Sequence, residues 1–273
     1  MVLRFFLLAS IFLFTFCHDL GKRDNPDDQD GINYQGGQLS SSSFVEPTVP
    51  SSSSVVPVVP SSSSVPVQTG IIKGTPVPYE GETYNTVVIG SQTWMAKNLN
   101  YAVEGSRCYN DSIAYCEKYG RLYSWAAAMG IDAKYNFEWW DIDEVKVNEK
   151  HKGICPSGWH IPSNAEWTTL TNYVGASTAG TKLRATSDWF NGTDYYGYSA
   201  LSGTDDYGFS ALPGGYGFPS GSFEDVGNRD YWWAATEYDA SYANHREIHY
   251  LSADVNSGSS DKCSFVSVRC VQD

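Results

Sequence analysis

Serine runs divide this chain into two parts with different capacities to fold. The stretches SSSSF, SSSSVVPVVP and SSSSVPVQTG all fall within residues 18–78. Serine runs stay flexible, and Val-Pro pairs favour extended polyproline geometry without internal hydrogen bonds. Such a segment buries too little apolar surface to offset the entropy that it loses on ordering. We therefore expect a disordered linker over 18–78. The folded core is expected in 79–273, which contains all nine tryptophans and is long enough for one domain.

The N-terminus has the pattern of an export signal. Arg4 precedes an apolar run that ends at Cys17, and this run is shorter than the roughly 20 residues that span a bilayer. A cysteine at the end of such a run is the acylation position of bacterial lipoprotein signals. We therefore expect a lipoprotein signal over 1–17, a lipid anchor at Cys17 and a location on the outer membrane or cell surface. The alternative is an ordinary signal peptide, because Phe16 replaces the small residue that usually precedes the lipidated cysteine.

The charge of the chain restricts its partners. The formal net charge is −13, and Lys and Arg do not cluster. Strong acidity argues against binding to nucleic acid or to an anionic membrane surface. We expect no nucleic-acid partner.

The cysteines beyond the signal fit an oxidising compartment. Cys108 and Cys116 bracket a short loop and are expected to form one disulfide bond. Cys155 and Cys270 are expected to form a second bond that ties the middle of the domain to its last strand. This pairing leaves Cys263 as the spare thiol. No CxxC or clustered Cys/His spacing supports the rival prediction of a zinc site.

Short helices are predicted in the first part of the domain. Residues 120–130 are alanine-rich, have apolar residues at helical spacing and end in glycine. Residues 162–175 contain a capping box made by Ser163 and Glu166, followed by apolar residues on one face. A third short helix is expected over 177–186.

Strands and loops are predicted to dominate the rest of the domain. Alternating apolar residues predict a strand, a turn at Gly90 and a second short strand near the start of the domain. Further strands are expected at 231–237, 246–253 and 264–272. Early helices followed by an antiparallel, loop-rich second half predict an α+β fold.

One segment of ten residues is followed by a second, nearly identical copy. The stretch GTDYYGYSAL at 192–201 is followed closely by GTDDYGFSAL at 203–212. A solenoid needs several stacked copies of its unit, and this period occurs nowhere else in the chain. Gly, Asp, Ser and Tyr are typical of turns and surfaces. We therefore predict a local duplication that lengthens one hairpin or loop.

Several phrases occur together in one order: GSQTWMAKNLNY, CEKYGRLYSWAAAM, GICPSGWHIPSNAEWTTL, GTKLRATSDW, DDYGFSALPGGY, YWWAATE and SVRCVQD. Together they resemble the Fibrobacter succinogenes major paralogous domain family of exported bacterial proteins, over essentially all of 79–273. The resemblance implies a lipoprotein with a Ser-rich or Pro-rich tether. The layout is also similar to the C-type lectin-like and sulfatase-modifying folds, which implies a C-type lectin-like single domain. Family members usually have one YGFSAL strand, whereas this chain has two.

Two groups of residues have the chemistry of metal ligands. His245, Glu247 and His249 alternate and would share one face of a strand, where they could hold a transition metal. Asp194, Asp205 and Asp206 lie in the duplicated turns, and oxygen-rich loops suit calcium. The alternatives are a solvent-facing strand and ordinary hairpin turns. Calcium is therefore a possible cofactor, and no other is indicated.

Aromatic residues predict a candidate ligand-binding face. In the strand Tyr231–Glu237, Trp232 faces one side and its neighbours the other. One side must belong to the core, and the other could stack on sugar rings. The candidate contact residues are Tyr195, Tyr196, Asp205, Asp206, Tyr207, Tyr216, Trp232 and Glu237.

We interpret the chain as a cell-surface, lipid-anchored binding protein for polysaccharide or for another surface protein. No catalytic constellation is found, and His160 in GWHIP is expected to be structural. Two other classes stay open: an enzyme of the sulfatase-modifying type that acts on carbohydrate or protein, and an architectural surface protein. The redox pair of that enzyme type would have to be Cys263 and Cys270, but Cys270 is already assigned to a long-range disulfide.

Overall fold

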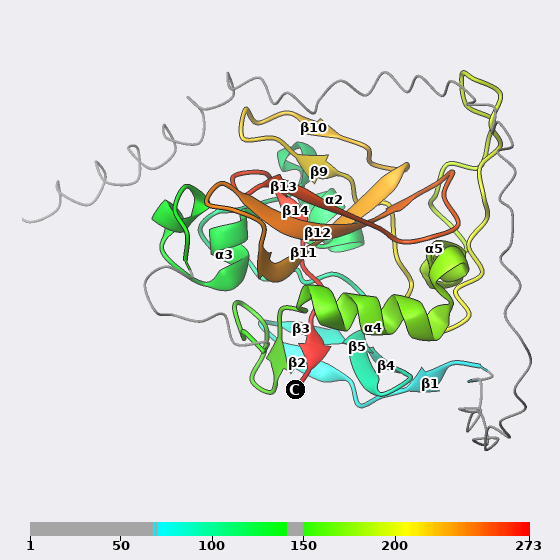
Figure 1. Ribbon diagram of the computed structural model, residues 1–273, viewed down its shortest axis with the longest axis horizontal. Helices are drawn as coiled ribbons and strands as arrows, with labels where there is room; N and C mark the ends of the chain where they lie inside the picture. The colour runs from blue at the N-terminus through cyan, green and yellow to red at the C-terminus, as the bar shows by residue number, and fades with distance from the viewer. Residues whose placement is uncertain (1–67, 69, 141–149) are drawn as a thin grey trace, which may run out of the picture. The chain divides into compact units, whose positions relative to one another are not determined.

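The computed structural model describes residues 68, 70–140 and 150–273 (Figure 1). The predicted signal with its lipid position Cys17, and the serine-rich part of the predicted linker, lie outside the described residues. None of the helices in the described residues combines the length and the apolar character that a bilayer span requires.

A five-stranded antiparallel sheet joins the start of the domain to its end. Its order is β1–β4–β5–β15–β8. The strands are β1 (Ile72–Lys73), β4 (Thr86–Ile89), β5 (Gln92–Met95), β15 (Val271–Gln272) and β8 (Trp159–His160). The last strand therefore lies between an early strand and one from the middle of the chain, which closes the domain.

A second sheet of the domain has six strands. Its order is β13–β12–β11–β14–β7–β6, and only the β11–β14 pair is parallel. The strands are β13 (Asn256–Asp261), β12 (Tyr242–His249), β11 (Arg229–Glu237), β14 (Val266–Ser267), β7 (Leu122–Tyr123) and β6 (Ser106–Arg107). Two small hairpins complete the strands: β2 (Val77–Tyr79) with β3 (Glu82–Tyr84), and β9 (Tyr216–Gly217) with β10 (Phe223–Glu224).

Short helices lie between the strands. The α-helices are α2 (Ile113–Tyr119), α3 (Trp125–Met129), α4 (Asn164–Val174) and α5 (Ala179–Leu183). The 3-10 helices are η1 (Tyr109–Asp111), η2 (Ala133–Asn136) and η4 (Ala176–Thr178). Short helices with mostly antiparallel strands confirm the predicted α+β class.

Helix α4 lies between the two sheets, as Figure 1 shows. The Ser163 hydroxyl accepts a hydrogen bond from the Glu166 amide (3.2 Å), and the Glu166 carboxylate accepts one from the Ser163 amide (2.9 Å). The predicted capping box is thus confirmed. Trp167, Leu170 and Val174 are buried, which holds the helix against β4 of one sheet and against β11 and β12 of the other.

The helix predicted over 120–130 is shorter than expected. Leu122–Tyr123 form strand β7, and α3 starts only at Trp125 because the Ser124 hydroxyl caps it by accepting from the Ala127 amide (3.4 Å). Gly130 ends the helix in the left-handed conformation.

Strand β11 is buried on both faces. Tyr231 and Trp233 pack into one hydrophobic core, while Trp232 and Ala234 pack into a second core on the opposite face. A central strand between two packed layers has this property. The prediction that one aromatic face of this strand is open to a ligand is therefore wrong.

The ordered part of the chain starts before residue 79. Ile72 and Lys73 of β1 pair with Val88 and Val87 of β4. The side chains of β1 are exposed, so backbone pairing, which composition does not reveal, holds this segment in place. The predicted linker boundary at residue 78 is therefore wrong.

Both predicted disulfides are confirmed. Cys108 is bonded to Cys116 and Cys155 to Cys270. Cys263 is not a free thiol, so the prediction of a spare thiol there is wrong. Because Cys270 is bonded to Cys155, it does not form a redox pair with Cys263.

A buried asparagine connects distant parts of the chain. The Asn98 side-chain oxygen accepts from Trp232 Nε1 (2.8 Å), Arg269 Nε (2.9 Å) and Arg269 Nη2 (2.6 Å). Its side-chain nitrogen donates to the Tyr119 carbonyl (3.1 Å) and to Asp230 Oδ2 (3.1 Å). Burial raises the pKa of Asp230 to about 7, while Asn98 and Arg269 oppose this rise. Asn98 therefore links a buried carboxyl, a buried guanidinium and a core indole.

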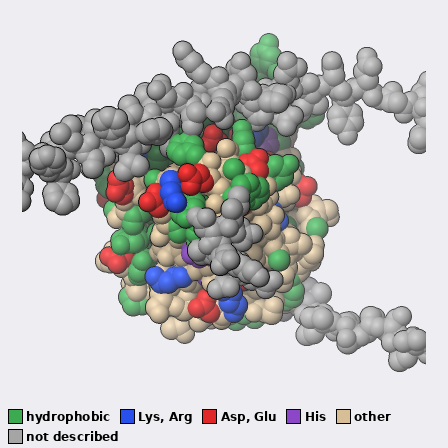
Figure 2. Space-filling model, turned by 60° about the vertical axis from the view of Figure 1, so that its left-hand side comes forward, with side chains coloured by type: hydrophobic (Ala, Val, Ile, Leu, Met, Phe, Trp, Pro, Cys, Tyr) green, Lys and Arg blue, Asp and Glu red, His purple; other side chains and the backbone are tan. Residues whose placement is uncertain are grey.

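Charged side chains are interspersed on the face shown in Figure 2. On that face, Lys and Arg lie singly among Asp and Glu rather than in a patch of their own.

Candidate functional site

The two copies of the duplicated segment have opposite environments. In the second copy, Tyr207, Phe209 and Ala211 are 5%, 0% and 0% exposed. In the first copy, Tyr196 and Tyr198, which correspond to Tyr207 and Phe209, are 79% and 65% exposed. The second copy fills the core, and the first is an added surface loop.

An aspartate shapes the exposed copy. Asp194 Oδ1 accepts from the amides of Tyr196 (3.0 Å) and Tyr198 (2.8 Å), and the Asp194 amide donates to the Tyr198 carbonyl (2.9 Å). Gly197 supplies a positive φ of 88° inside this turn. Tyr195 is 96% exposed and lies edge-on to Tyr196. The turn therefore displays its tyrosines to solvent.

Within the part of the chain that the structure describes, the exposed copy belongs to the largest run of exposed apolar side chains. Five of the nine large hydrophobic side chains that are exposed in the described residues fall within 190–201. These five residues, which we call the tyrosine patch, are Phe190, Tyr195, Tyr196, Tyr198 and Leu201. The patch continues into Tyr250, whose ring contacts Phe190 edge-on at a centroid distance of 5.1 Å. Clustered exposed apolar residues of this kind mark binding surfaces.

Two of the predicted aromatic contact residues, Trp232 and Tyr207, are covered by the core, and a third, Tyr216, is only half-buried. Trp232 is fully buried and donates to Asn98. Tyr207 is buried, and its ring contacts Tyr173. Tyr216 is half-buried and packs against Tyr231. The prediction of Trp232 and Tyr207 as stacking residues is wrong, because the core covers both side chains.

Glu237 also has a structural position. Its side chain is 4% exposed and pairs at 2.5 Å with Lys262, whose side chain is fully buried. A Glu237 oxygen also accepts from the Trp140 amide (3.1 Å). The prediction of Glu237 as a ligand contact is therefore wrong.

The histidines of β12 do not form a metal site. His245 is buried against Ser260, and burial lowers its pKa to about 4. Glu247 faces Arg229 and accepts from Asn256, while burial lowers the pKa of His249 to about 4. Across the described part of the chain, no group of three or more His, Cys, Asp or Glu side chains is placed to hold a metal ion. The predicted site at His245, Glu247 and His249 is wrong.

Two of the duplicated aspartates stabilise turns, and the three belong to no group of carboxylates placed to hold a metal ion among the described residues. Asp205 accepts from the Ser210 amide (2.8 Å) and hydroxyl (2.6 Å) in the way that Asp194 caps its own turn. Burial raises the pKa of Asp205, and the bonds from Ser210 oppose that rise. Asp206 is exposed. The calcium site predicted from Asp194, Asp205 and Asp206 is therefore wrong.

A groove that the sequence did not predict lies beside α3. Its volume is about 370 Å³, within the range of sites for small ligands. On one side, Arg107 pairs with Asp111 at 2.5 Å and lies over the Phe265 ring. The lining residues come from five separate parts of the chain: Glu104, Gly105, Arg107, Ser124, Ala127, Ile131, Asp132, Ala133, Asn136, Pro219, Cys263 and Phe265.

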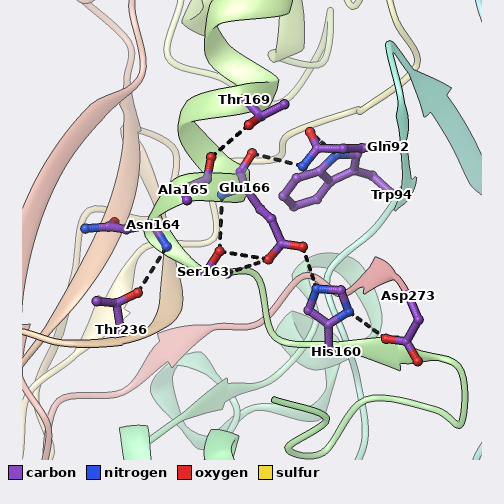
Figure 3. Close-up of polar contacts among 10 residues, drawn as sticks. All are labelled: Gln92, Trp94, His160, Ser163, Asn164, Ala165, Glu166, Thr169, Thr236 and Asp273. Atoms are coloured by element: carbon purple, nitrogen blue, oxygen red, sulfur yellow. Dashed lines mark hydrogen bonds and ion pairs between the residues drawn. The ribbon is translucent and has the colours of Figure 1, made fainter. Parts of the chain in front are cut away.

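His160 lies between two carboxylates (Figure 3). Its Nε2 is 2.7 Å from Glu166 Oε1, and its Nδ1 is 2.7 Å from Asp273 Oδ1. Burial opposes the charged imidazole, but the two carboxylates outweigh burial and raise the pKa of His160. The residue is fully buried and ties β8 to α4 and to the C-terminal residue, which supports the expected structural role.

The stability of the domain should depend on the protonation of His160. A base whose pKa is raised in the folded state adds stability below its unfolded pKa, and that stability is lost as the pH rises through the folded pKa. The His160→Gln substitution should therefore reduce the free energy of unfolding more at about pH 5.5 than at about pH 9. Urea unfolding of both proteins at the two pH values measures the difference.

His151 provides a control of opposite sign. Burial lowers its pKa, and its bond to the Met129 carbonyl opposes this shift only partly. The His151→Gln substitution should therefore cost less at about pH 5.5 than at about pH 9. If the losses in the free energy of unfolding of the two variants depend on pH in the same way, the two carboxylates do not favour a charged His160 imidazole in the folded domain.

The comparison with known proteins gives one match. No curated protein and no solved structure matches the chain. The family model of the Fibrobacter succinogenes major domain matches residues 87–272, which include the whole second core, all buried residues of the first core except Tyr84, and the duplicated segment. The chain therefore belongs to the Fibrobacter succinogenes major domain family.

Proposed function

We propose that this protein is an exported, lipid-anchored surface protein that binds polysaccharide, and that the tyrosine patch is its contact surface. The observation that carries the proposal is the exposure of Tyr195, Tyr196 and Tyr198 in a copy of a segment whose other copy already completes the core. The exposed copy is not needed to fill that core. Its aromatic side chains are therefore free to serve a ligand.

The chemistry of the patch suits sugar rings. Tyrosine combines an apolar face with a hydroxyl and loses little rotamer freedom on binding. Asp194 fixes the backbone that carries the three tyrosines, which reduces the ordering cost of binding. The export signal predicted over 1–17, with Cys17 as anchor, would place this surface outside the cell.

We also propose that the domain has a C-type lectin-like arrangement. The pairing of the last strand β15 with the early strand β5, and the central position of β11, support this assignment. Fold likeness alone does not give a ligand, so the proposed activity depends on the tyrosine patch.

A pull-down on insoluble polysaccharides tests the proposal. The variant Tyr195→Ser/Tyr196→Ser/Tyr198→Ser should bind at least about a hundredfold more weakly, because a buried aromatic contact commonly contributes about 1 kcal/mol or more to binding. All three side chains are exposed, so the free energy of unfolding should change by less than about 0.5 kcal/mol per site. Calcium or a chelator should not alter retention of the wild type.

Two variants make the result specific. Tyr238→Ser removes a tyrosine that is exposed outside the patch and should leave retention unchanged. Ala133→Trp fills the groove beside α3 and should also have no effect. If the triple variant is retained like the wild type while Ala133→Trp is not, the groove and not the patch is the binding site. If no polysaccharide retains the wild type, the proposed function is wrong.

A further inference from the structure

We propose that the two copies of the duplicated segment are interchangeable in the core. The core slot is the site that residues 203–212 occupy in the structure. In the alternative register, residues 192–201 occupy the core slot and residues 203–212 form the exposed loop. This inference does not depend on the proposed polysaccharide binding.

The first copy has glycine at both positions where the core slot requires it. A Cβ atom added to Gly203 would lie 2.3 Å from the Ala185 carbonyl oxygen, so no other residue fits there. Gly208 has a φ of 70°, in the left-handed region. The corresponding residues of the first copy are Gly192 and Gly197. Both therefore satisfy the slot.

The first copy also has the polar residues that the slot uses. Asp205 and Ser210 have φ values of 48° and 53° and are hydrogen-bonded to each other. The corresponding Asp194 and Ser199 are not in this left-handed conformation in the exposed loop. Identical residue types thus adopt different backbone conformations, which indicates that the slot and not the local sequence imposes the conformation.

One buried difference separates the two registers. Phe209 is fully buried beneath the Arg269 guanidinium, 4.2 Å from its ring centroid. Tyr198 would bring a hydroxyl into this position, and burying a hydroxyl without a partner is unfavourable. The nearby Trp167 Nε1, whose ring is 6.2 Å from that of Phe209, is buried without a hydrogen-bond partner among the described residues. The slot therefore disfavours tyrosine, and Trp167 Nε1 is a buried donor near it that has no partner in the observed register.

The connections permit the exchange. Gly203 lies against Ala185, and in the alternative register Gly192 would take this position. Residues 186–191 would then form a short loop that starts and ends beside Ala185. Residues 202–212 would then form a loop whose ends meet at the exit of the slot, and loop closure depends weakly on length. The contact from the Arg184 guanidinium to the Leu201 carbonyl and the hydrogen bond from the Leu201 amide to the Tyr250 carbonyl (2.9 Å) would have to be released.

Exchange of the register changes the exposed side chains. The other difference in the aromatic region, Tyr195 against Asp206, falls at a position that is exposed in both copies. The observed register displays three tyrosines, and the alternative register would display Asp206, Tyr207 and Phe209. The register therefore selects between an aromatic loop and a more acidic one.

Two alanine substitutions in the full chain test the change of register, which hydrogen–deuterium exchange with mass spectrometry can follow. Gly203→Ala blocks the second copy from the slot. Protection should then move to the amides of 192–201, with rates at least about tenfold slower than in the wild type, while 203–212 becomes fast. In the observed register, the atoms nearest to a Cβ at Gly192 belong to the exposed Phe190 ring, which can move aside, so Gly192→Ala should leave the wild-type pattern unchanged.

The double variant gives the decisive comparison. With both glycines replaced, neither copy fits, so the urea midpoint should fall well below that of Gly203→Ala alone. If Gly203→Ala fails to fold, or if its loss of stability equals that of the double variant, the copies are not interchangeable. The Tyr198→Phe variant provides a second test that needs no clash. The Tyr198→Phe substitution should speed hydrogen–deuterium exchange of the amides in 203–212 and slow that of the amides in 192–201. An unchanged pattern of amide protection would contradict the proposal.

Discussion

Replacing Cys155 and Cys270 together with alanine should lower the free energy of unfolding by about 5 kcal/mol. The bond joins residues separated by 115 positions, and the entropy that a disulfide removes from the unfolded chain grows with the length of the closed loop. Both residues are fully buried, so alanine should introduce no unsatisfied polar group. Urea unfolding of the oxidised wild type and the double variant measures the difference.

The second disulfide is the matched control. Cys108 and Cys116 are separated by 8 positions, so the double alanine variant at these sites should cost only about 2.5 kcal/mol. Both variants lose two sulfurs from buried positions and differ mainly in the loop they open. Equal losses would show that packing of the sulfurs, and not loop closure, determines the contribution of each bond.

Features set by neighbouring residues could be predicted from the sequence. The capping box of α4 depends on Ser163 and Glu166, which are three positions apart and act without the rest of the fold. The two disulfides followed from cysteine spacing and from the positions of Cys155 and Cys270. In both cases the chemistry of a few residues leaves few alternatives.

Features that depend on how distant parts of the chain pack or pair with one another could not be predicted in this way. Alternation in β11 shows that Trp232 and Trp233 face opposite sides, but it cannot show that both sides are covered. Strand β13, with the sequence NSGSSD, has no apolar pattern. It forms because β12 offers a free edge, to which its backbone pairs from Tyr242↔Asp261 to Glu247↔Asn256.

The duplicated segment shows most clearly what cannot be predicted from local sequence. The two copies have nearly the same local sequence, so local propensity assigns them the same structure. Their burial differs because one slot in the core can hold only one copy. The patch residues Tyr195 and Tyr196 were predicted as contacts and are exposed, whereas Tyr207 was predicted by the same reasoning and is buried.

Replacing Asn98 with alanine should lower the free energy of unfolding by about 3–5 kcal/mol, the cost of leaving buried charged groups without a partner. Asn98 is buried and makes five hydrogen bonds, two of them to the fully buried Arg269 guanidinium. Without this side chain, the Trp232 N–H and part of the Arg269 guanidinium lose their acceptor, and Asp230 loses a donor. The loss should be visible in urea unfolding at neutral pH.

Asn100 provides the comparison that makes this result interpretable. It is only half-buried and donates one hydrogen bond to Glu82 at 2.5 Å, so Asn100→Ala should cost about 1 kcal/mol. A cavity of about 20 Å³ lies beside Asn98 and Arg269, enough for about one water molecule. Asn98→Ala could lower the free energy of unfolding no more than Asn100→Ala does. In that case water in the enlarged cavity replaces the asparagine, and the Asn98 side chain is not needed to connect Asp230, Arg269 and the core indole.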